Sequence, residues 1–278
     1  MTKCWIPPLF AILVSVCGAA QDLAIQQATV HVTDDGATAT SDYRFQPGDT
    51  AYFSFVIAGF QKSEENQIKL AYTIEARDPA GVLISPQAIG HIAVGISQED
   101  KHWQPKVREN LVVPSLAGSG RYEIAVKLRD ELAEKDIDTR VVFQVEGRDV
   151  QPSDTLILRN FRFVRGENDE KALDVAAYRA GDTVWARFDM TGYKFGEGNR
   201  FEVAYGLTVL RPDGTVTYSQ PEAATAAGES FYPQRYAPGE LSLNCPKDLP
   251  RGEYTLVVQV HDKAGGQTYE MRQKFSIE

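Results

Sequence analysis

Two segments of the sequence decide the fold: GRYEIAVKLRD at residues 120–130 and GEYTLVVQVHD at residues 252–262. Each begins with Gly-x-Tyr, continues with apolar residues at every second position and ends in an aspartate. Successive side chains of a strand point to opposite faces, so this alternation predicts a strand with one buried face. The sequence therefore predicts that the same strand occurs twice, 132 positions apart.

The similarity extends outward from these segments along most of the chain. Gly48-Asp49-Thr50 recurs as Gly181-Asp182-Thr183, and 11 of the 39 residues from 43 to 81 are identical to the residues 133 positions later. A one-residue insertion or deletion accounts for the change of offset from 133 to 132. We predict two copies of one domain, residues 22–150 and 151–278, each of an ordinary size for a domain.

Both predicted copies are patterned as strands throughout. Short alternating runs are separated by turn signals such as Pro47-Gly48-Asp49 and Pro212-Asp213-Gly214, whereas helical spacing is limited to one possible turn within 130–138. The predicted fold class is all-β: two tandem immunoglobulin-like antiparallel β-sandwich domains after a cleaved signal peptide. The predicted core positions are Ala51, Phe53, Phe55, Ile57, Ile68, Leu70, Tyr72, Ile74, Tyr122, Ile124, Val126 and Leu128 in the first copy, and Leu156, Leu158, Phe161, Phe163, Val184, Ala186, Phe188, Met190, Phe201, Val203, Tyr205, Leu207, Val209, Tyr254, Leu256, Val258, Val260, Phe275 and Ile277 in the second.

The first 20 residues are typical of a secretory signal peptide. Lys3 precedes an apolar run over residues 9–16, and Gly18-Ala19-Ala20 supplies the small residues of a cleavage site. The run is too short to span a bilayer, and no other long apolar run exists in the sequence. We expect a periplasmic or secreted protein that does not span the membrane, with lipidation at Cys17 as the alternative. Cleavage leaves Cys245 as the one cysteine, and we expect it to be a buried apolar side chain.

The Gly-x-Tyr strands with their terminal Asp130 and Asp262 resemble the penultimate strand of bacterial extracytoplasmic immunoglobulin-like modules. The resemblance implies the sandwich fold and a location outside the cytoplasm, but no activity. It also implies that Tyr122 and Tyr254 form tyrosine corners, in which the hydroxyl group hydrogen-bonds to backbone. The inter-sheet cysteine pair of antibody domains is absent.

The composition and the motifs argue against several kinds of chemistry. The net charge is −9, which is unfavourable for nucleic-acid binding, and no zinc spacing, Walker A, dinucleotide-binding or Gly-x-Ser-x-Gly motif is present. We expect no enzymatic activity, no cofactor and no metal. Two acidic stretches, within 130–138 and 167–170, offer carboxylates of the kind that bind calcium, but solvated loops are the favoured interpretation because neither has an EF-hand register.

The strongest candidate for recognition is a group of aromatic residues in the second copy. Flat aromatic side chains suit glycan or peptide docking, whereas the alternative is packing under loops or between the two domains. Glycan binding requires Tyr193, Phe195 and Tyr232 to be exposed and roughly coplanar. The six candidate ligand-binding residues are Trp185, Tyr193, Phe195, Phe231, Tyr232 and Tyr236.

The leading hypothesis is a secreted or periplasmic, non-enzymatic binding or structural protein whose partner is an envelope or extracellular protein or polysaccharide. The alternatives are a carbohydrate-binding module that uses the loop aromatics, and a periplasmic assembly chaperone. The chaperone hypothesis requires an angled, basic cleft, and the 13 basic and 20 acidic residues of 22–150 disfavour it.

Overall fold

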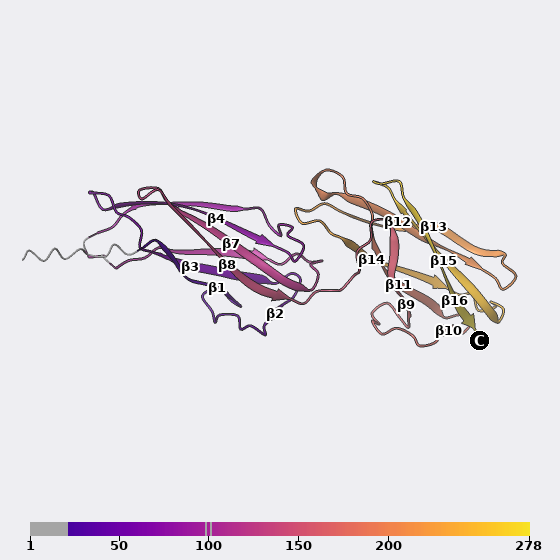
Figure 1. The fold of residues 1–278 in the computed structure, drawn as a ribbon. Coiled ribbons are helices and arrows are strands. Elements are labelled where there is room, and N and C mark those ends of the chain that lie inside the picture. The colour runs from indigo at the N-terminus through magenta and orange to yellow at the C-terminus, as the bar shows by residue number, and fades with distance from the viewer. Residues whose placement is uncertain (1–21, 98, 101) are drawn as a thin grey trace, which may run out of the picture.

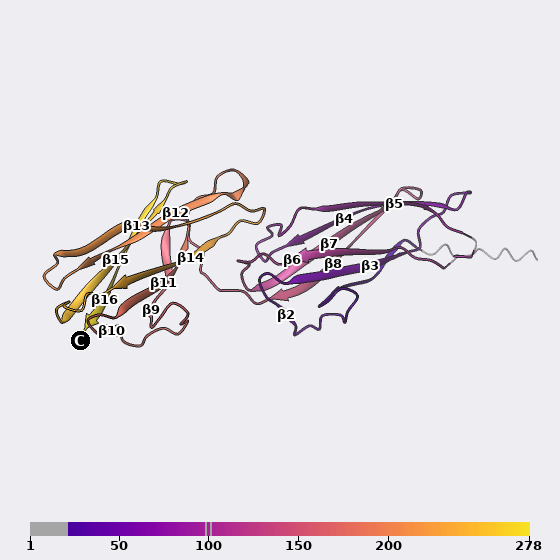
Figure 2. The same cartoon turned by 180° about the vertical axis from the view of Figure 1, so that it is seen from behind.

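The computed structural model describes residues 22–97, 99–100 and 102–278, and these residues form four β-sheets. The predicted signal peptide and its cleavage site, like the alternative lipidation site Cys17, lie outside the described residues. Figures 1 and 2 show two sheet sandwiches that lie end to end, with the chain passing once from the first to the second.

The first half contains eight strands in two sheets. The three-stranded sheet has the order β1-β3-β6 and the five-stranded sheet has the order β2-β8-β7-β4-β5. The strands are β1 (Ala24–His31), β2 (Arg44–Phe45), β3 (Thr50–Ala58), β4 (Gln67–Arg77), β5 (Ala88–Gly95), β6 (Lys106–Val112), β7 (Gly120–Asp130) and β8 (Lys135–Val145).

The second half follows the same plan. The sheet orders are β9-β11-β14 and β10-β16-β15-β12-β13, so the two halves correspond strand by strand when β1 is matched to β9 and β8 to β16. The elements are β9 (Ile157–Val164), β10 (Ala177–Tyr178), β11 (Thr183–Thr191), a 3₁₀ turn η1 (Glu197–Asn199), β12 (Phe201–Leu210), β13 (Val216–Gly228), β14 (Tyr236–Asn244), β15 (Gly252–Asp262) and β16 (Thr268–Ile277).

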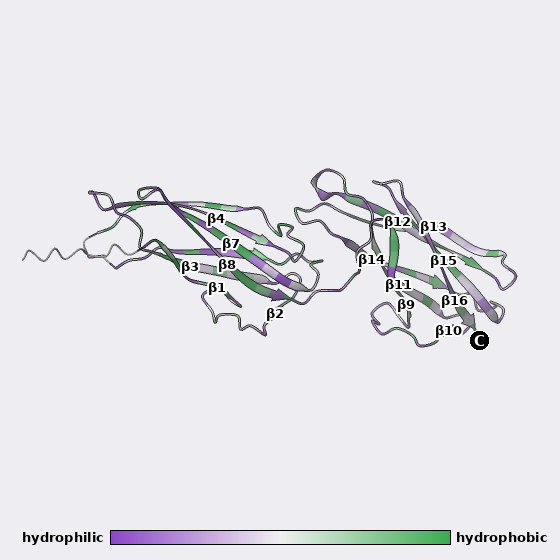
Figure 3. Cartoon of the chain, viewed as in Figure 1, coloured by the Kyte–Doolittle hydropathy of each residue, from purple (hydrophilic) through white to green (hydrophobic). Residues whose placement is uncertain are grey.

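The fold is all-β, as predicted, and each half has the two-layer immunoglobulin-like arrangement. All of the predicted core positions are buried except Tyr72 and Phe161, which are half-buried, and each half has its own apolar core between its two sheets. Figure 3 shows the apolar residues concentrated along the strands. The sequence 130–138 forms a hairpin turn and the start of β8 rather than a helical turn, because Asp130 caps that turn through its side chain.

The repeated Gly-Asp-Thr motif forms the same turn in both halves. Gly48 and Gly181 adopt φ values of 93° and 95°, a region that favours glycine. The next aspartate closes the turn, since Asp49 accepts the backbone N–H of Gln46 and Asp182 accepts that of Arg179. The strands β3 and β11 therefore begin at equivalent positions.

Two strand pairings differ from the antiparallel prediction. β2 pairs in parallel with β8, and β10 pairs in parallel with β16. In each half the chain leaves the three-stranded sheet after its first strand and joins one edge of the other sheet, where it runs beside the last strand. A two-residue strand is too short to produce a readable alternation in the sequence.

Candidate functional site at the junction of the two sandwiches

The junction is built around Asp78, which follows β4 and begins the turn of residues 78–81. Its Oδ1 accepts hydrogen bonds from the backbone N–H groups of Ala80 and Val82, at 2.9 and 2.8 Å. Its Oδ2 accepts the hydroxyl of Tyr232 at 2.9 Å and lies 3.1 Å from Nη2 of Arg235. The Asp78 side chain is 2% exposed. One carboxylate thus caps a turn of the first sandwich and binds two side chains of the second.

Tyr232 inserts into the first sandwich although it belongs to the second half of the chain. It is buried and packs in the same apolar cluster as Phe45, Ile74 and Tyr122. Burial, reinforced by the Tyr122 hydroxyl and the Asp78 charge, raises the pKa of Tyr232 well above its ordinary value. The hydroxyl is therefore protonated throughout the ordinary pH range and donates to Asp78.

A second buried carboxylate, Asp189 of β11, ties the linker to the second sandwich. Asn160 of β9 donates its Nδ2–H to Oδ2 of Asp189 at 2.8 Å. Nη1 of Arg148, in the linker after β8, lies 3.0 Å from Oδ1, outside hydrogen-bond geometry, so this contact is an ion pair. The alternation of apolar residues along β11 predicts an outward, polar face for Asp189, but its side chain is fully buried where it contacts Arg148 and Asn160.

Three of the six candidate aromatic residues are buried near this junction. They are Tyr193, Tyr232 and Tyr236, and Tyr193 stacks on Phe201 with ring centroids 4.7 Å apart. The hydroxyl of Tyr193 donates to the backbone carbonyl of Gln234, which holds the 229–235 loop down. The exposed, coplanar group that glycan binding requires of Tyr193, Phe195 and Tyr232 is therefore not formed. Tyr232 instead makes the inter-domain packing that was the alternative interpretation.

The other three candidates differ in their surroundings. Trp185 is half-buried on β11, and Phe195 is 37% exposed against Tyr193. Phe231 is 49% exposed and lines a groove of about 380 Å³ between the two halves. Val112, itself 56% exposed, Ile84 and Pro114 line the first-half side of the same groove. Ligand binding by the six residues remains a prediction, and Phe231 is the one placed in a groove with an exposed ring.

The predicted tyrosine corners are present. The hydroxyl of Tyr122 donates to the carbonyl of Gly118 at 3.0 Å, and that of Tyr254 donates to the carbonyl of Pro250 at 2.8 Å. Both bonds span four residues. The resemblance of the two Gly-x-Tyr strands to immunoglobulin-like modules is thus matched by the same local geometry.

The aspartates of the two acidic stretches accept hydrogen bonds from backbone N–H groups of the loops that contain them. Asp130 is fully buried, and its carboxylate accepts three backbone N–H groups, from Gln61, Leu132 and Ala133. In the second stretch, Asp169 accepts the N–H of Lys171. Within residues 22–97, 99–100 and 102–278, no group of three or more His, Cys, Asp or Glu side chains is placed to hold a metal ion. In the same part of the chain, no helix is long and apolar enough to cross a membrane.

Cys245 is buried, as predicted. Burial raises the pKa of its thiol, and the charge of Asp182 adds to this effect. A raised pKa keeps the thiol protonated at neutral pH, which is unfavourable for a nucleophile.

Sequence reasoning did not identify the four charged residues of the junction: Asp78, Arg148, Asp189 and Arg235. One signal was available in the repeat itself. At the offset of 133, Asp78 is matched by Arg211 and Asp189 by Val56. Both junction aspartates therefore occupy positions where the two copies differ in charge.

The comparisons with known proteins identify no family. No family model matches the chain, and no curated protein matches it. Among solved structures, it is similar to the C-terminal domain of the Streptococcus agalactiae antigen I/II polypeptide BspA, with 10% identity and a TM-score of 0.32 over 91% of this chain and all of that one.

Two further similarities are of the same kind. The C-terminal domain of the Streptococcus pyogenes antigen I/II-family protein AspA matches over 92% of this chain and 99% of its own, with 9% identity and a TM-score of 0.34. A tetra-tandem repeat in the extending region of a large adhesion protein matches over 92% and 50%, with 13% identity and a TM-score of 0.29. Similarities this weak carry no conclusion about family or function.

Proposed function

We propose that this protein is an exported, non-enzymatic binding or structural protein made of two immunoglobulin-like domains, residues 22–150 and 151–278. It acts outside the cytoplasm, in the periplasm or after secretion, on an envelope or extracellular protein or polysaccharide. The signal peptide of residues 1–20 directs export, and lipidation at Cys17 is the minor alternative.

The observation that carries this proposal is the pair of buried carboxylates at the junction. Asp78 holds Tyr232 and Arg235 of the other sandwich, while Asp189 holds Arg148 of the linker. Two anchors at one junction restrict rotation as well as separation. Domains joined in this way suit a protein that presents a surface at a fixed distance and orientation, whereas freely linked domains move independently.

Binding at the junction groove is the more specific version of the proposal. Phe231 and Val112 expose apolar surface on opposite walls of this groove. Exposed apolar side chains around a concave site are typical of recognition surfaces. The carbohydrate-module alternative loses its support because Tyr193 and Tyr232 are buried. The chaperone alternative requires an angled cleft, whereas the two sandwiches lie end to end (Figure 1).

The fixed junction is tested by a distance measurement. Spin labels attached at Val142→Cys on β8 and Val216→Cys on β13, both exposed positions, report the separation of the halves by pulsed electron paramagnetic resonance. We expect one narrow distance distribution in the mature protein and a broad one in Asp78→Ala. Asp213→Ala is the matched control, because Asp213 caps the equivalent turn of the second half through Thr215. A broad distribution in the unsubstituted protein contradicts the fixed junction.

The binding version is tested separately with the immobilised mature protein. We expect it to retain a polypeptide or polysaccharide from envelope extracts and expect Phe231→Ala to lose that retention. Tyr218→Ala, which removes another exposed ring from β13, should leave retention unchanged. Equal retention by all three proteins contradicts a site in the groove, and retention of nothing leaves the structural role alone.

A further inference from the structure

β5 is an unpaired edge strand with an unusual composition for that position. It ends the five-stranded sheet of the first half and reads AIGHIAVG over Ala88–Gly95. It has eight residues, no proline and no Asp, Glu, Lys or Arg, and five of its residues are exposed. A long, uncharged, apolar edge is a template for pairing with another strand.

The free hydrogen-bonding groups of β5 follow from its register with β4. The N–H of Ile96 donates to the carbonyl of Asn66 at 2.9 Å, and the ladder continues without a register shift to the pair Ile74 and Ala88. Alternate residues of an antiparallel pair point their N–H and C=O groups away from the partner strand. In β5 these are the odd-numbered residues Ile89, His91, Ala93 and Gly95.

The other long edge strands are protected against pairing. β13 contains Pro221 and Glu222 and has two register shifts against β12, and β14 contains Pro238 and Glu240. β6 carries Lys106, Arg108 and Glu109. β1 and β9 each have a register shift against their neighbour. Proline, charge and bulges are the devices that prevent edge association, and among the edge strands of the described residues that are longer than two residues β5 alone uses none of them.

The sequence of β5 is complementary to itself in one antiparallel register. When Ile92 lies opposite Ile92 of a second copy, Ile89 faces Gly95 and His91 faces Ala93 on the outer face of the sheet. On the inner face, Gly90 faces Val94. Apart from the Ile92 pair on the axis, each larger side chain meets a small one. The four residues with free backbone groups pair with those of the other copy, which allows about eight new backbone hydrogen bonds.

We propose that two copies of this chain associate through β5, antiparallel about a two-fold axis at Ile92, to form a continuous ten-stranded sheet. The interface is isologous and pairs the β5 edge of each copy with that of the other. Since the second sandwich lies beyond one end of the first (Figures 1 and 2), the two-fold axis places the two second sandwiches at opposite ends of the dimer.

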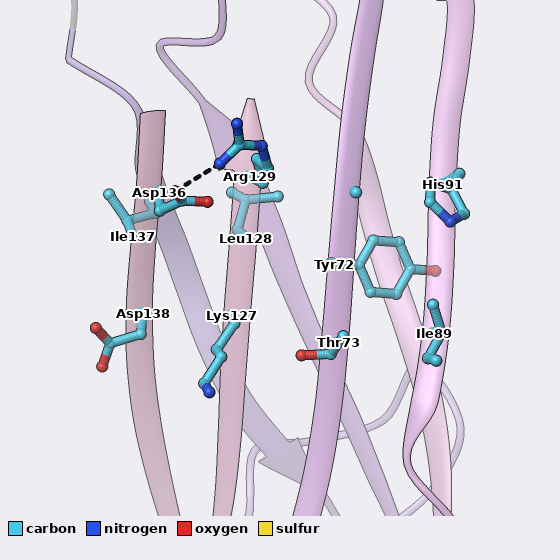
Figure 4. Close-up of a pocket in the computed structure, with 11 residues that line it drawn as sticks. Tyr72, Thr73, Ile89, His91, Lys127, Leu128, Arg129, Asp136, Ile137 and Asp138 are labelled. Carbon is cyan, nitrogen blue, oxygen red and sulfur yellow. Dashed lines mark hydrogen bonds and ion pairs between the residues drawn. The ribbon is translucent and has the colours of Figure 1, made fainter. Parts of the chain in front are cut away.

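The outer face beside the edge adds apolar area to this contact. Ile89, which is 67% exposed, and His91 border a shallow groove of about 460 Å³ whose floor includes Ala71 and Thr73 of β4 (Figure 4). The Arg129–Asp136 ion pair closes the groove on its far side, away from β5. The groove is therefore continuous with the edge at which the second copy adds.

Charge and interface size predict a weak dimer that salt strengthens. Residues 22–150 carry 13 basic and 20 acidic side chains, so two copies repel each other, although β5 itself contributes no fixed charge. Salt screens repulsion between exposed charges, so association should tighten as ionic strength rises. A single strand pair is small beside a standard interface of about 1,600 Å², so the dimer should form at high protein concentration.

Sedimentation equilibrium of the mature chain tests the dimer. We expect a concentration-dependent dimer whose dissociation constant rises at least about tenfold in Ala93→Lys, which places two cations near the two-fold axis. Ala227→Lys on edge strand β13 is the matched control and should dimerise like the unsubstituted chain. Ala93→Pro removes one of the free N–H groups while keeping the ladder to β4, and it should weaken the dimer as well. The proposal is overturned if the unsubstituted chain stays monomeric at all concentrations and salt levels, or if the Ala93→Lys variant dimerises as well as the unsubstituted chain.

Cross-linking tests the register. The free thiol of Ile92→Cys lies opposite its own copy at a pair without backbone hydrogen bonds, where Cα atoms approach to about 4.5 Å, within disulfide range. We expect oxidation to link Ile92→Cys into a covalent dimer more readily than His91→Cys. Preferential linking of His91→Cys instead contradicts the proposed register, and a protein that links neither contradicts the edge contact.

Discussion

The two tyrosine corners are the most direct link between single residues and the fold. Tyr122 and Tyr254 are buried at 0% and 1% exposure, yet each hydroxyl reaches a carbonyl of the loop before its own strand. These hydrogen bonds fix the position at which β7 and β15 begin. They are the two central strands whose alternating pattern is clearest in the sequence. A Gly-x-Tyr pattern predicts this geometry because the ring enters the core while its polar end must find an acceptor.

Replacing either corner tyrosine with phenylalanine should destabilise the protein. Tyr122→Phe and Tyr254→Phe keep the ring but leave the carbonyl of Gly118 or Pro250 without its partner, at an expected cost of about 1–2 kcal/mol each in the free energy of unfolding. Urea unfolding monitored by circular dichroism measures this cost. Tyr218→Phe, whose hydroxyl is on the surface, should change stability by less than about 0.5 kcal/mol. Equal effects of all three substitutions contradict the role of the corner bond.

Alkaline pH should weaken the fold through its buried tyrosines. Burial raises the pKa of Tyr178 to about 12 from 10.0, and its hydroxyl donates to the carbonyl of Val164. The unfolded chain therefore loses this proton first, so the stabilisation is complete below pH 10 and declines between about pH 10 and 12, by up to about 3 kcal/mol. Denaturant unfolding from pH 8 upward measures the decline. Tyr178→Phe should show a shallower decline than the unsubstituted protein, and an identical slope is the contrary result.

At the scale of elements, the central strands were predictable because one face of each is buried. The alternation of Val184, Ala186, Phe188 and Met190 corresponds to the buried face of β11. The alternation did not reveal Asp189, because burial by the linker is independent of the strand's own period. The short parallel strands β2 and β10 also carry no periodic signal, since two residues cannot define one.

Gly239 illustrates a constraint between neighbouring strands that the sequence does not reveal. It lies opposite Phe188 in the β11–β14 ladder, and a Cβ atom at this position would lie 2.2 Å from the Phe188 ring. Gly239→Ala should therefore displace that ring from the core and cost about 1–3 kcal/mol. Gly166→Ala, where a Cβ meets nothing within 4 Å, should be nearly neutral. Thermal unfolding compares the two variants, and equal melting temperatures contradict the close packing.

At the scale of the whole molecule, the repeat predicted two similar units but not how they meet. The contact between Tyr232 and Asp78 joins residues 154 positions apart. The periodicity of the sequence within one copy cannot reveal such a contact, because the contact depends on which loops face the other copy. The differences between copies are therefore more informative about the junction than their similarities: Arg211 and Val56, which match Asp78 and Asp189 at the repeat offset, have no part in it.

The junction should couple the stabilities of the two halves. Residues 22–278 contain one tryptophan in each half, Trp103 and Trp185, so in a protein of these residues Trp185→Phe reports the first half and Trp103→Phe the second. In either background, Tyr232→Phe removes the hydroxyl that Asp78 accepts while keeping the ring in the first core. We expect it to lower the free energy of unfolding of the first half by about 1–2 kcal/mol, because the Asp78 carboxylate loses a buried donor.

The same substitution should also separate the two fluorescence transitions in urea, because each half then unfolds with less dependence on the other. Tyr218→Phe on β13 is the matched control for the second half, since its hydroxyl bonds only to Gln220 nearby. Two transitions that stay equally spaced in Tyr232→Phe and Tyr218→Phe would mean that the halves are linked by the chain alone. That result would contradict the fixed orientation of the two domains on which the proposed structural role depends. It would not bear on the association of two copies through β5, which sedimentation equilibrium tests separately.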